Sequence, residues 1–206
     1  GAVTEYRREL DISNATAMVE YLMDGRRFRE EYFVSAPESA IVVRMLSESP
    51  EDAILRLEIP HPHTVSTSDG RIVVDGYTAW HAYPGYYAVN GEQRVYDPQR
   101  GIHFRTIASV ETDGKVTASE GSLTVSGATE TVIRIVNATS FNGFDKDPVR
   151  EGRPYKELAE AQAASASAKS YHKLLKAHIA DYRHYFDRVS IDLGETDPEV
   201  KALPTD

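Results

Sequence analysis

One stretch of the chain gathers the ring side chains best suited to binding a ligand. Residues 77–98, YTAWHAYPGYYAVNGEQRVYDP, contain the protein's one tryptophan, Trp80, five of its twelve tyrosines, and His81. Aromatic rings in a loop-rich segment can stack on the apolar face of a sugar, and they can also cover a sheet edge or contact another domain. The sequence leaves these uses open, and we favour a domain interface.

A second unusual stretch, residues 137–154 (NATSFNGFDKDPVREGRP), combines turn-forming residues with two phenylalanines. Its Asn, Gly, Asp and Pro residues indicate a loop, in which Asn142 and Gly143 permit a turn with positive φ. We expect Phe141 and Phe144 to fix this loop by burying both rings, which would be worth roughly 1.5–3 kcal/mol each. The pattern therefore predicts a structured connection between two elements.

The histidines give weaker indications of chemistry. His61 and His63 flank a proline but lack further ligands, so we expect a strand-ending loop there and no metal site. His172, His178 and His184 are six residues apart on a predicted helix, so they point in three different directions and cannot converge on one ion.

The motifs of several enzyme classes are absent. The chain has no cysteine, no G-x-S-x-G or HExxH motif and no Gly-rich phosphate loop. With 32 Asp and Glu residues, no pair can be selected as the two carboxylates of a glycoside hydrolase. The formal net charge of −9 argues against a nucleic-acid partner, and no apolar run is long enough to predict a membrane span. We expect no metal or organic cofactor.

Residues 6–136 predict about ten short strands separated by turns. Asp-Gly pairs at 24–25, 69–70 and 113–114 are strong hairpin signals, and no helix-length pattern intervenes, so the strands are expected to be antiparallel. Residues 27–36 alternate, with Phe28, Tyr32 and Val34 on one side of the strand. Residues 39–47 are densely apolar and predict a strand covered on both faces, and residues 53–59 predict a separate strand.

The periodicity changes to helical from Pro154 onward. A second helix is expected to begin after Ser170 as N-cap and to bury an apolar stripe. The stripe consists of Tyr171, Leu175, Ile179, Tyr182 and Phe186. Residues 189–194 (VSIDLG) alternate like a short strand, and the acidic, Pro-containing residues 195–206 indicate a linker.

Several segments together resemble the inverting α-L-fucosidases of glycoside hydrolase family 95. The family's Y-x-R-x-L-D-L and R-E-x-F-x-S-x-P-x-x-x-x-V-x-R patterns are matched, the first with Ile at its last position. The matching residues are Tyr6, Arg8, Leu10, Asp11, Ile12, Arg29, Glu30, Phe33, Ser35, Pro37, Val43 and Arg44. The segments SFNGFDKDP and HIADYRHYFDRVSIDLG are the most specific pieces, and the resemblance extends over nearly the whole chain.

This resemblance implies a mainly β architecture in three parts. Residues 1–149 would form an antiparallel β-supersandwich of the galactose-mutarotase-like kind, and residues 150–193 a helical linker. Residues 194–206 would begin the connection to a catalytic (α/α)6 barrel. The chain would then be an internal slice of an enzyme, without the first strands of the sandwich and without the barrel.

The resemblance also implies a function for the parent protein, an exo-acting enzyme that hydrolyses terminal α-L-fucosyl linkages with inversion. Its acid and base would lie in the barrel, so no catalytic residue is expected in this chain. The expected partners are a fucosylated glycan, bound through the barrel, and the barrel itself, with neither nucleic acid nor membrane. We expect a bacterial protein exported to the periplasm or the cell exterior.

The two unusual stretches then acquire candidate roles. In the parent enzyme, Asn142, Asp145 or Lys146 could touch substrate, although a rigid hinge between domains is the favoured role for their loop. Trp80 and His81 are the other candidates for a substrate pocket or domain interface. Two alternatives stay open: a sandwich that binds carbohydrate independently of catalysis, and the same scaffold in an α-L-galactosidase-like hydrolase.

Overall fold

The computed structural model describes residues 1–87 and 91–204, and most of these belong to antiparallel strands. The strands are β1 (Val3–Asp11), β2 (Thr16–Met23), β3 (Arg26–Ser35), β4 (Ala40–Leu55), β5 (His63–Ser68), β6 (Arg71–Tyr77), β7 (His81–Ala82), β8 (Arg94–Val95), β9 (His103–Thr112), β10 (Lys115–Ser119) and β11 (Ser122–Thr139). The helices are α1 (Tyr155–Ser167), α2 (Tyr171–Phe186) and α3 (Pro198–Lys201). The predicted class, antiparallel β followed by helices, is confirmed.

Nine strands form one sheet in the order β1-β2-β3-β4-β11-β9-β6-β5, with β10 added alongside β11. Two of the predicted Asp-Gly hairpins show why these residues are needed. Asp24 and Gly25 have φ values of 53° and 78°, and Asp69 and Gly70 have 45° and 71°. Positive φ at both central positions is the type I′ geometry, which matches the twist of the strands that it joins.

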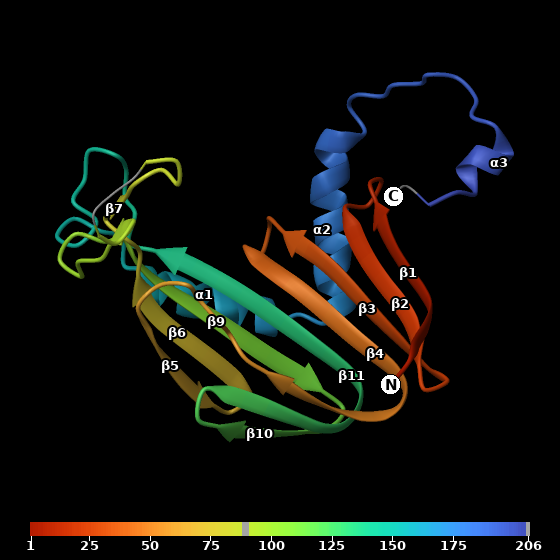
Figure 1. Ribbon diagram of the computed structural model, residues 1–206, viewed down its shortest axis with the longest axis horizontal. Helices are drawn as coiled ribbons and strands as arrows, with labels where there is room; N and C mark the ends of the chain where they lie inside the picture. The colour runs from red at the N-terminus through yellow and green to blue at the C-terminus, as the bar shows by residue number, and fades with distance from the viewer. Residues whose placement is uncertain (88–90, 205–206) are drawn as a thin grey trace.

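The two longest strands, β4 and β11, bend the sheet over on itself (Figure 1). Residues 131–139 of β11 pair with β9, whereas residues 122–126 pair with β10. The expected break between two strands near Pro50 does not occur. Strand β4 continues through this position, and its pairing with β11 is irregular there. Proline has no N–H for the ladder, so it is tolerated where the register shifts.

Folding the sheet over encloses a core between its halves. Leu123, at the start of β11, packs with Ile72 and Phe104 from the other half of the sheet. Burial along β4 alternates, however. Ala40 and Val42 are buried, but Ile41 is 44% exposed, so the prediction of a strand covered on both faces is wrong here.

Helices α1 and α2 cover the outer, convex face of the sheet, behind it in Figure 1. The fully buried residues of helix α1 are alanines, and Ala159, Ala163 and Ala166 pack against Ile107 and Val136. Tyr155 and Leu158 of the same helix are partly buried against this cluster. Small side chains let the helix backbone approach the strands closely. No described helix is long and apolar enough to cross a membrane.

Helix α2 begins after Ser170 as predicted, but its buried stripe differs from the expected one. Tyr171, Leu174 and His178 are buried, whereas Phe186 is 39% exposed. The His178 ring stacks on Phe33 with 4.9 Å between ring centroids, and its Nε2 lies 3.1 and 3.0 Å from two carbonyl oxygens of the β1–β2 turn. A histidine therefore takes the place that an apolar residue would have in the stripe, because its ring packs while its N–H donates to the turn.

We expect overpacking at the interface between α1 and the sheet to destabilise the chain. Ala159 has no exposed surface and Ala164 lies on the exposed side of the same helix. Replacing Ala159 with Leu should lower the free energy of unfolding by about 1–3 kcal/mol in urea denaturation. Replacing Ala164 with Leu should change it by less than about 0.5 kcal/mol. Equal losses in both variants would show that the helix does not dock as described.

A charged network crosses from the sheet to α1. Asp75 on β6 and Arg105 on β9 are cross-strand partners, and the guanidinium donates to both carboxylate oxygens at 2.8 and 2.6 Å. Arg105 also reaches Glu160 of α1 at 3.1 Å, and Arg71 reaches the same carboxylate at 2.6 Å. The hydrogen bonds from Arg105 lower the pKa of Asp75 below its ordinary value, against the opposing effect of burial.

This network predicts a pH-dependent contribution to stability. Because the folded-state pKa of Asp75 is lowered, its contribution is present above the unfolded-state pKa of about 3.9 and is lost as the pH falls through the folded value. Replacing Asp75 with Asn should cost about 1 kcal/mol at pH 7, and the difference from the wild type should shrink below about pH 4. Urea denaturation across pH measures this, with Glu195→Gln in the exposed tail as control. A pH-independent difference would contradict the assignment.

Candidate functional site

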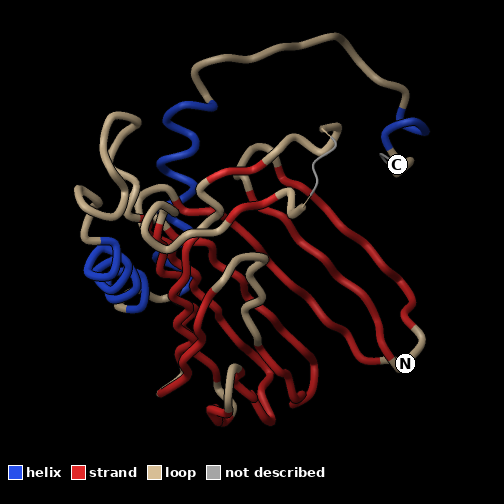
Figure 2. The backbone as a smooth tube through the Cα atoms, turned by 60° about the vertical axis from the view of Figure 1, so that its left-hand side comes forward, coloured by secondary structure: helices blue, strands red, loops and turns tan. Residues whose placement is uncertain are grey.

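Two long connections lie together at one end of the molecule, and we call this region the loop end (Figures 1 and 2). They are residues 78–102, between β6 and β9, and residues 140–154, between β11 and α1. His103 joins them, because its N–H donates to Ser140 Oγ at 3.0 Å and its Nε2 lies 2.8 Å from the Pro98 carbonyl. The Ser140 N–H donates back to the His103 carbonyl at 2.8 Å.

Trp80 lies beside the small β7–β8 ribbon, and its backbone N–H donates to the Val95 carbonyl at 3.1 Å. The guanidinium carbon of Arg100 lies 3.5 Å from the Trp80 ring centroid. This is a close cation–π contact, which fixes the ring and covers one of its faces. Trp80 remains 39% exposed, so its other surface is accessible.

The neighbouring rings pack on one another in two different orientations. His81 lies edge-to-face with Tyr83, with ring centroids 4.5 Å apart and an interplanar angle of 83°. Tyr83 stacks on Tyr87 at 6.1 Å and 11°. Tyr86 points into solvent with 91% exposure. Residues 88–90 of this connection lie outside the described part of the chain.

The second connection is held by polar contacts. The Asn142 side-chain amide donates to the Glu151 carbonyl at 2.9 Å, and Asp147 Oδ1 accepts from the Val149 and Arg150 N–H groups at 2.8 and 3.0 Å. The bonds from the Arg150 and Val149 N–H groups lower the pKa of Asp147. Gly152 is needed for space, because a Cβ there would lie 2.2 Å from the Pro148 carbonyl oxygen.

The expected burial of the two phenylalanines is wrong. Phe141 is 49% exposed and Phe144 is 98% exposed. The loop is fixed instead by hydrogen bonds that Ser140 and Asn142 donate and that Asp147 accepts, so the rings are free to project from it. Gly143 has a φ of 115°, which confirms the predicted positive-φ turn at this position.

Asp145 and Lys146 are exposed and lie in the same turn. Lys146 Nζ is 3.6 Å from Glu151 Oε1 and 3.9 Å from Asp145 Oδ2. The structure thus brings all five predicted residues to the loop end, with Trp80 and His81 in one connection and Asn142, Asp145 and Lys146 in the other. Among the described contacts, none joins the two groups directly.

The histidines expected to be structural have structural partners. His61 Nδ1 lies 3.1 Å from the Tyr96 hydroxyl, and His63 Nδ1 lies 2.6 Å from the His61 carbonyl. Among residues 1–87 and 91–204, no group of three or more His, Asp or Glu side chains could hold a metal ion.

Two functional features were missed from the sequence. Arg100 covers Trp80, and His103 with Ser140 joins the two connections. No motif in the sequence marks these contacts, because they link residues 20 and 37 positions apart. Chemically, the loop end offers fixed rings, amides and a few charges, which suits it to contact and binding.

Comparisons with known proteins find a family and two curated relatives that the chain matches. The protein family described as "Glycosyl hydrolase family 65, N-terminal domain" matches this chain over residues 1–143. "Alpha-L-fucosidase 2" of Arabidopsis thaliana is 28% identical over 199 residues, covering 92% of this chain and 24% of that protein. "Probable alpha-fucosidase A" of Aspergillus oryzae is 23% identical over 202 residues, covering 94% of this chain and 26% of that protein.

A solved structure shares the fold. The chain called "Putative kojibiose phosphorylase from human microbiome" superposes with a TM-score of 0.50 and 12% identity, over 88% of this chain and 23% of that one. The present chain therefore spans about a quarter of the length of the relatives it matches. The expected resemblance to the N-terminal part of an α-L-fucosidase is confirmed by the two curated relatives. This chain belongs to the family described as glycosyl hydrolase family 65, N-terminal domain.

Proposed function

We propose that this chain is the non-catalytic N-terminal domain of an exo-acting α-L-fucosidase that cleaves terminal α-L-fucosyl linkages with inversion. The acid and the base would lie in a barrel domain outside residues 1–206. The acid protonates the leaving oxygen while an activated water attacks the opposite face of the sugar. The chain's own share is to support the barrel and to present the loop end to it.

The observation that carries this proposal is the exposure of large apolar side chains from a fixed loop end. Phe144 is 98% exposed and Tyr86 is 91% exposed, although the connections that hold them are ordered by hydrogen bonds. Exposed rings on an ordered support are typical of a contact surface. The loop end is therefore the surface that best fits an interface with the rest of the enzyme.

The segment after α2 supports the same proposal. Residues 189–194 alternate as a strand would, but they pair with no described strand. Val189, Ile191 and Leu193 are 80%, 84% and 93% exposed. Apolar groups on one side of an extended segment gain free energy when another surface covers them.

An independent carbohydrate-binding module is the less supported alternative. Such a platform needs coplanar rings with open faces, but Arg100 covers one face of Trp80 and the Trp80 and His81 rings are inclined by 44°. Asn142, Asp145 and Lys146 remain the candidates for direct contact with substrate from a pocket wall. An α-L-galactosidase-like reaction on the same scaffold stays the closest chemical alternative.

Hydrolysis of 4-nitrophenyl α-L-fucoside tests the proposal on the full-length parent and on residues 1–206. We expect an active parent and an inactive isolated chain, because the acid and base lie elsewhere. Activity in residues 1–206 alone would overturn the proposal and move the search for two carboxylates into the sheet. A parent that cleaves only the corresponding galactoside would favour the alternative reaction.

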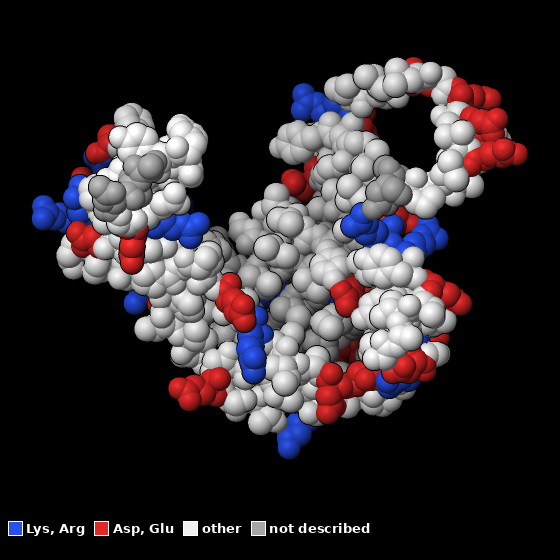
Figure 3. Space-filling view, viewed as in Figure 1, with Lys and Arg blue, Asp and Glu red and all other residues white. Residues whose placement is uncertain are grey.

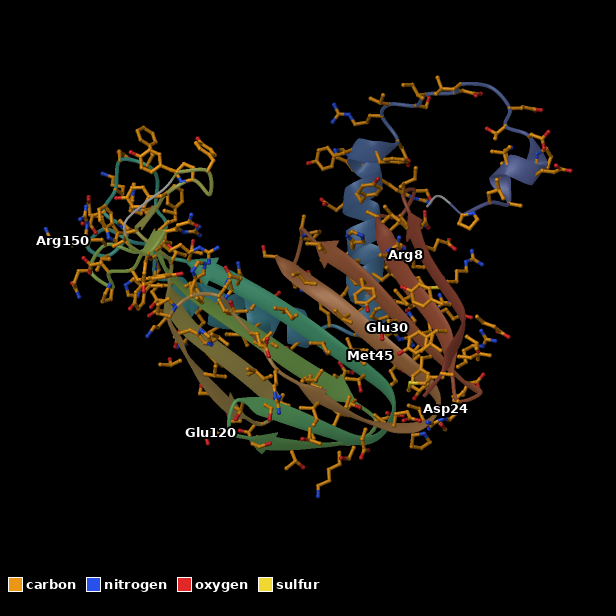
Figure 4. The ribbon with its side chains drawn as sticks, in the orientation of Figure 1. Arg8, Asp24, Glu30, Met45, Glu120 and Arg150 are labelled. Atoms are coloured by element: carbon orange, nitrogen blue, oxygen red, sulfur yellow. The ribbon has the colours of Figure 1, made fainter. Side chains whose placement is uncertain are left out.

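A variant at the loop end tests its role as an interface. In the full-length protein, Phe144→Ala should lower the midpoint of thermal inactivation and raise KM several-fold, because the ring loses its covering surface. Phe144→Tyr should behave like the wild type. Glu120→Ala, in the exposed β10–β11 turn far from the loop end (Figure 4), is the location control. If Phe144→Ala leaves stability and KM unchanged, the ring contacts neither the barrel nor the substrate pocket.

A further inference from the structure

A separate recess lies on the concave face of the sheet, on the side opposite the helices. It is a cavity of about 220 Å³ between β2, β3 and β4 and the bend of β11. Glu30 and Met45 line it from neighbouring strands, side by side in Figure 4. The space-filling view shows the middle of this face hollowed, with acidic side chains beside the hollow (Figure 3).

Two rings form one wall of the cavity. Tyr21 of β2 and Phe28 of β3 are cross-strand partners, and their rings stack with centroids 5.3 Å apart at 12°. Met45, Val125 and Ala128 add further apolar surface. Because the rings stack on each other and the Arg26 guanidinium carbon lies 6.0 Å from the Phe28 ring centroid, a ligand would meet the remaining ring surface together with the Met45 side chain. This apolar surface suits the C–H groups of a sugar ring.

Glu30 is fixed on the same face as an acceptor. Its carboxylate accepts a hydrogen bond from the Tyr32 hydroxyl, and it also interacts with the Tyr21 hydroxyl. Burial is the largest cause that raises the pKa of both tyrosines, and Glu30 raises it further. Both hydroxyls therefore stay protonated, and they hold the Glu30 carboxylate at the cavity wall.

The other carboxylates at the rim are each bound through one oxygen. Glu51 binds Arg26 through Oε1, and Asp52 Oδ1 accepts the Gly127 N–H at 2.8 Å. Glu51 Oε2 and Asp52 Oδ2 accept no hydrogen bond from a described residue, so each can accept one from a ligand hydroxyl. Glu130 also lines the cavity and accepts from Arg44 through Oε1, so two of the four lining carboxylates have an arginine partner. The remaining carboxylate oxygens suit a ligand with several hydroxyls, which donate to them.

We propose that this cavity binds one ring of a neutral sugar, with the ring's apolar face on Tyr21 and Phe28 and its hydroxyls donating to Glu30, Glu51 and Asp52. The volume of about 220 Å³ lies below that of drug-sized pockets, which begin at roughly 300 Å³, and so suits a single ring. The site is separate from the loop end, and its occupation does not depend on the reaction of the parent enzyme.

The three methionines make a direct test, because Met23 and Met45 line the cavity and Met18 does not. The chain with ¹³C-labelled methionine methyl groups is titrated with L-fucose, D-galactose and D-glucose and followed by NMR. We expect at least one sugar to shift the Met23 and Met45 signals saturably while Met18 stays fixed. We expect a Kd on the order of 1 mM, which corresponds to the low end of ligand efficiencies for a molecule of about twelve heavy atoms.

Matched variants localise the effect. Glu30→Gln should weaken binding about tenfold, because a charged acceptor becomes a neutral one, and Phe28→Ala should abolish saturation. Glu120→Gln, which makes the same chemical change on the exposed turn, should leave the titration unchanged. Circular dichroism checks that each variant keeps its fold, and Tyr21→Phe provides a milder second change if Phe28→Ala does not fold.

Two results would overturn the proposal. The first is a titration to about 100 mM of each sugar, roughly a hundredfold above the expected Kd, that gives no saturable shift at Met23 and Met45. Equal shifts at all three methionines would count in the same way. The other is a change in the Met23 and Met45 signals between this chain and the full-length protein, together with loss of the response to sugar. That result would mean that a protein segment occupies the cavity. Neither result bears on hydrolysis by the parent, so the proposed function is tested independently.

Discussion

The pairing of β11 with strands on both of its sides is the constraint on which the rest of the structure depends. Its 18 residues pair with β4 on one side and with β10 and then β9 on the other. The change of partner along one strand requires the sheet to bend, and the bend creates both the enclosed core around Leu123 and the recess on the concave face. The last residues of β11 then lead directly to Ser140, which fixes the loop end.

The helices stabilise this bent sheet from its convex side in two different ways. Helix α1 packs through alanines, so its position is set by close backbone approach and by the ion pairs from Arg71 and Arg105 to Glu160. Arg134 of β11 is only 3% exposed, and it donates to the Lys169 carbonyl between the helices at 2.9 Å. A buried guanidinium needs such partners, so the junction between α1 and α2 is tied to the central strand.

Much of this architecture was predictable because it follows from local chemistry. Two of the three Asp-Gly pairs adopt positive φ at both residues, and Pro154 and Ser170 each directly precede a helix, as predicted. The sequence did not reveal that β4 passes through Pro50, because that depends on a register shift against residues some eighty positions away. The burial of His178 likewise depends on carbonyls of the β1–β2 turn, which the periodicity of the helix cannot show.

The two candidate surfaces differ in what holds their aromatic residues, and this difference indicates different uses. Phe144 projects from backbone that is fixed by hydrogen bonds around it, so its exposed ring can be covered only by something outside the described chain. Tyr21 and Phe28 instead lie on paired strands and stack on each other, beside a carboxylate bound by tyrosine hydroxyls. A projecting ring suits a large surface that meets it, whereas a recessed pair with acceptors beside it suits a small ligand. Residues 77–98 and 137–154, singled out in the sequence, belong to the two connections of the loop end, and their role there stays a prediction. The recess could be found only once β2, β3, β4 and β11 were paired in space.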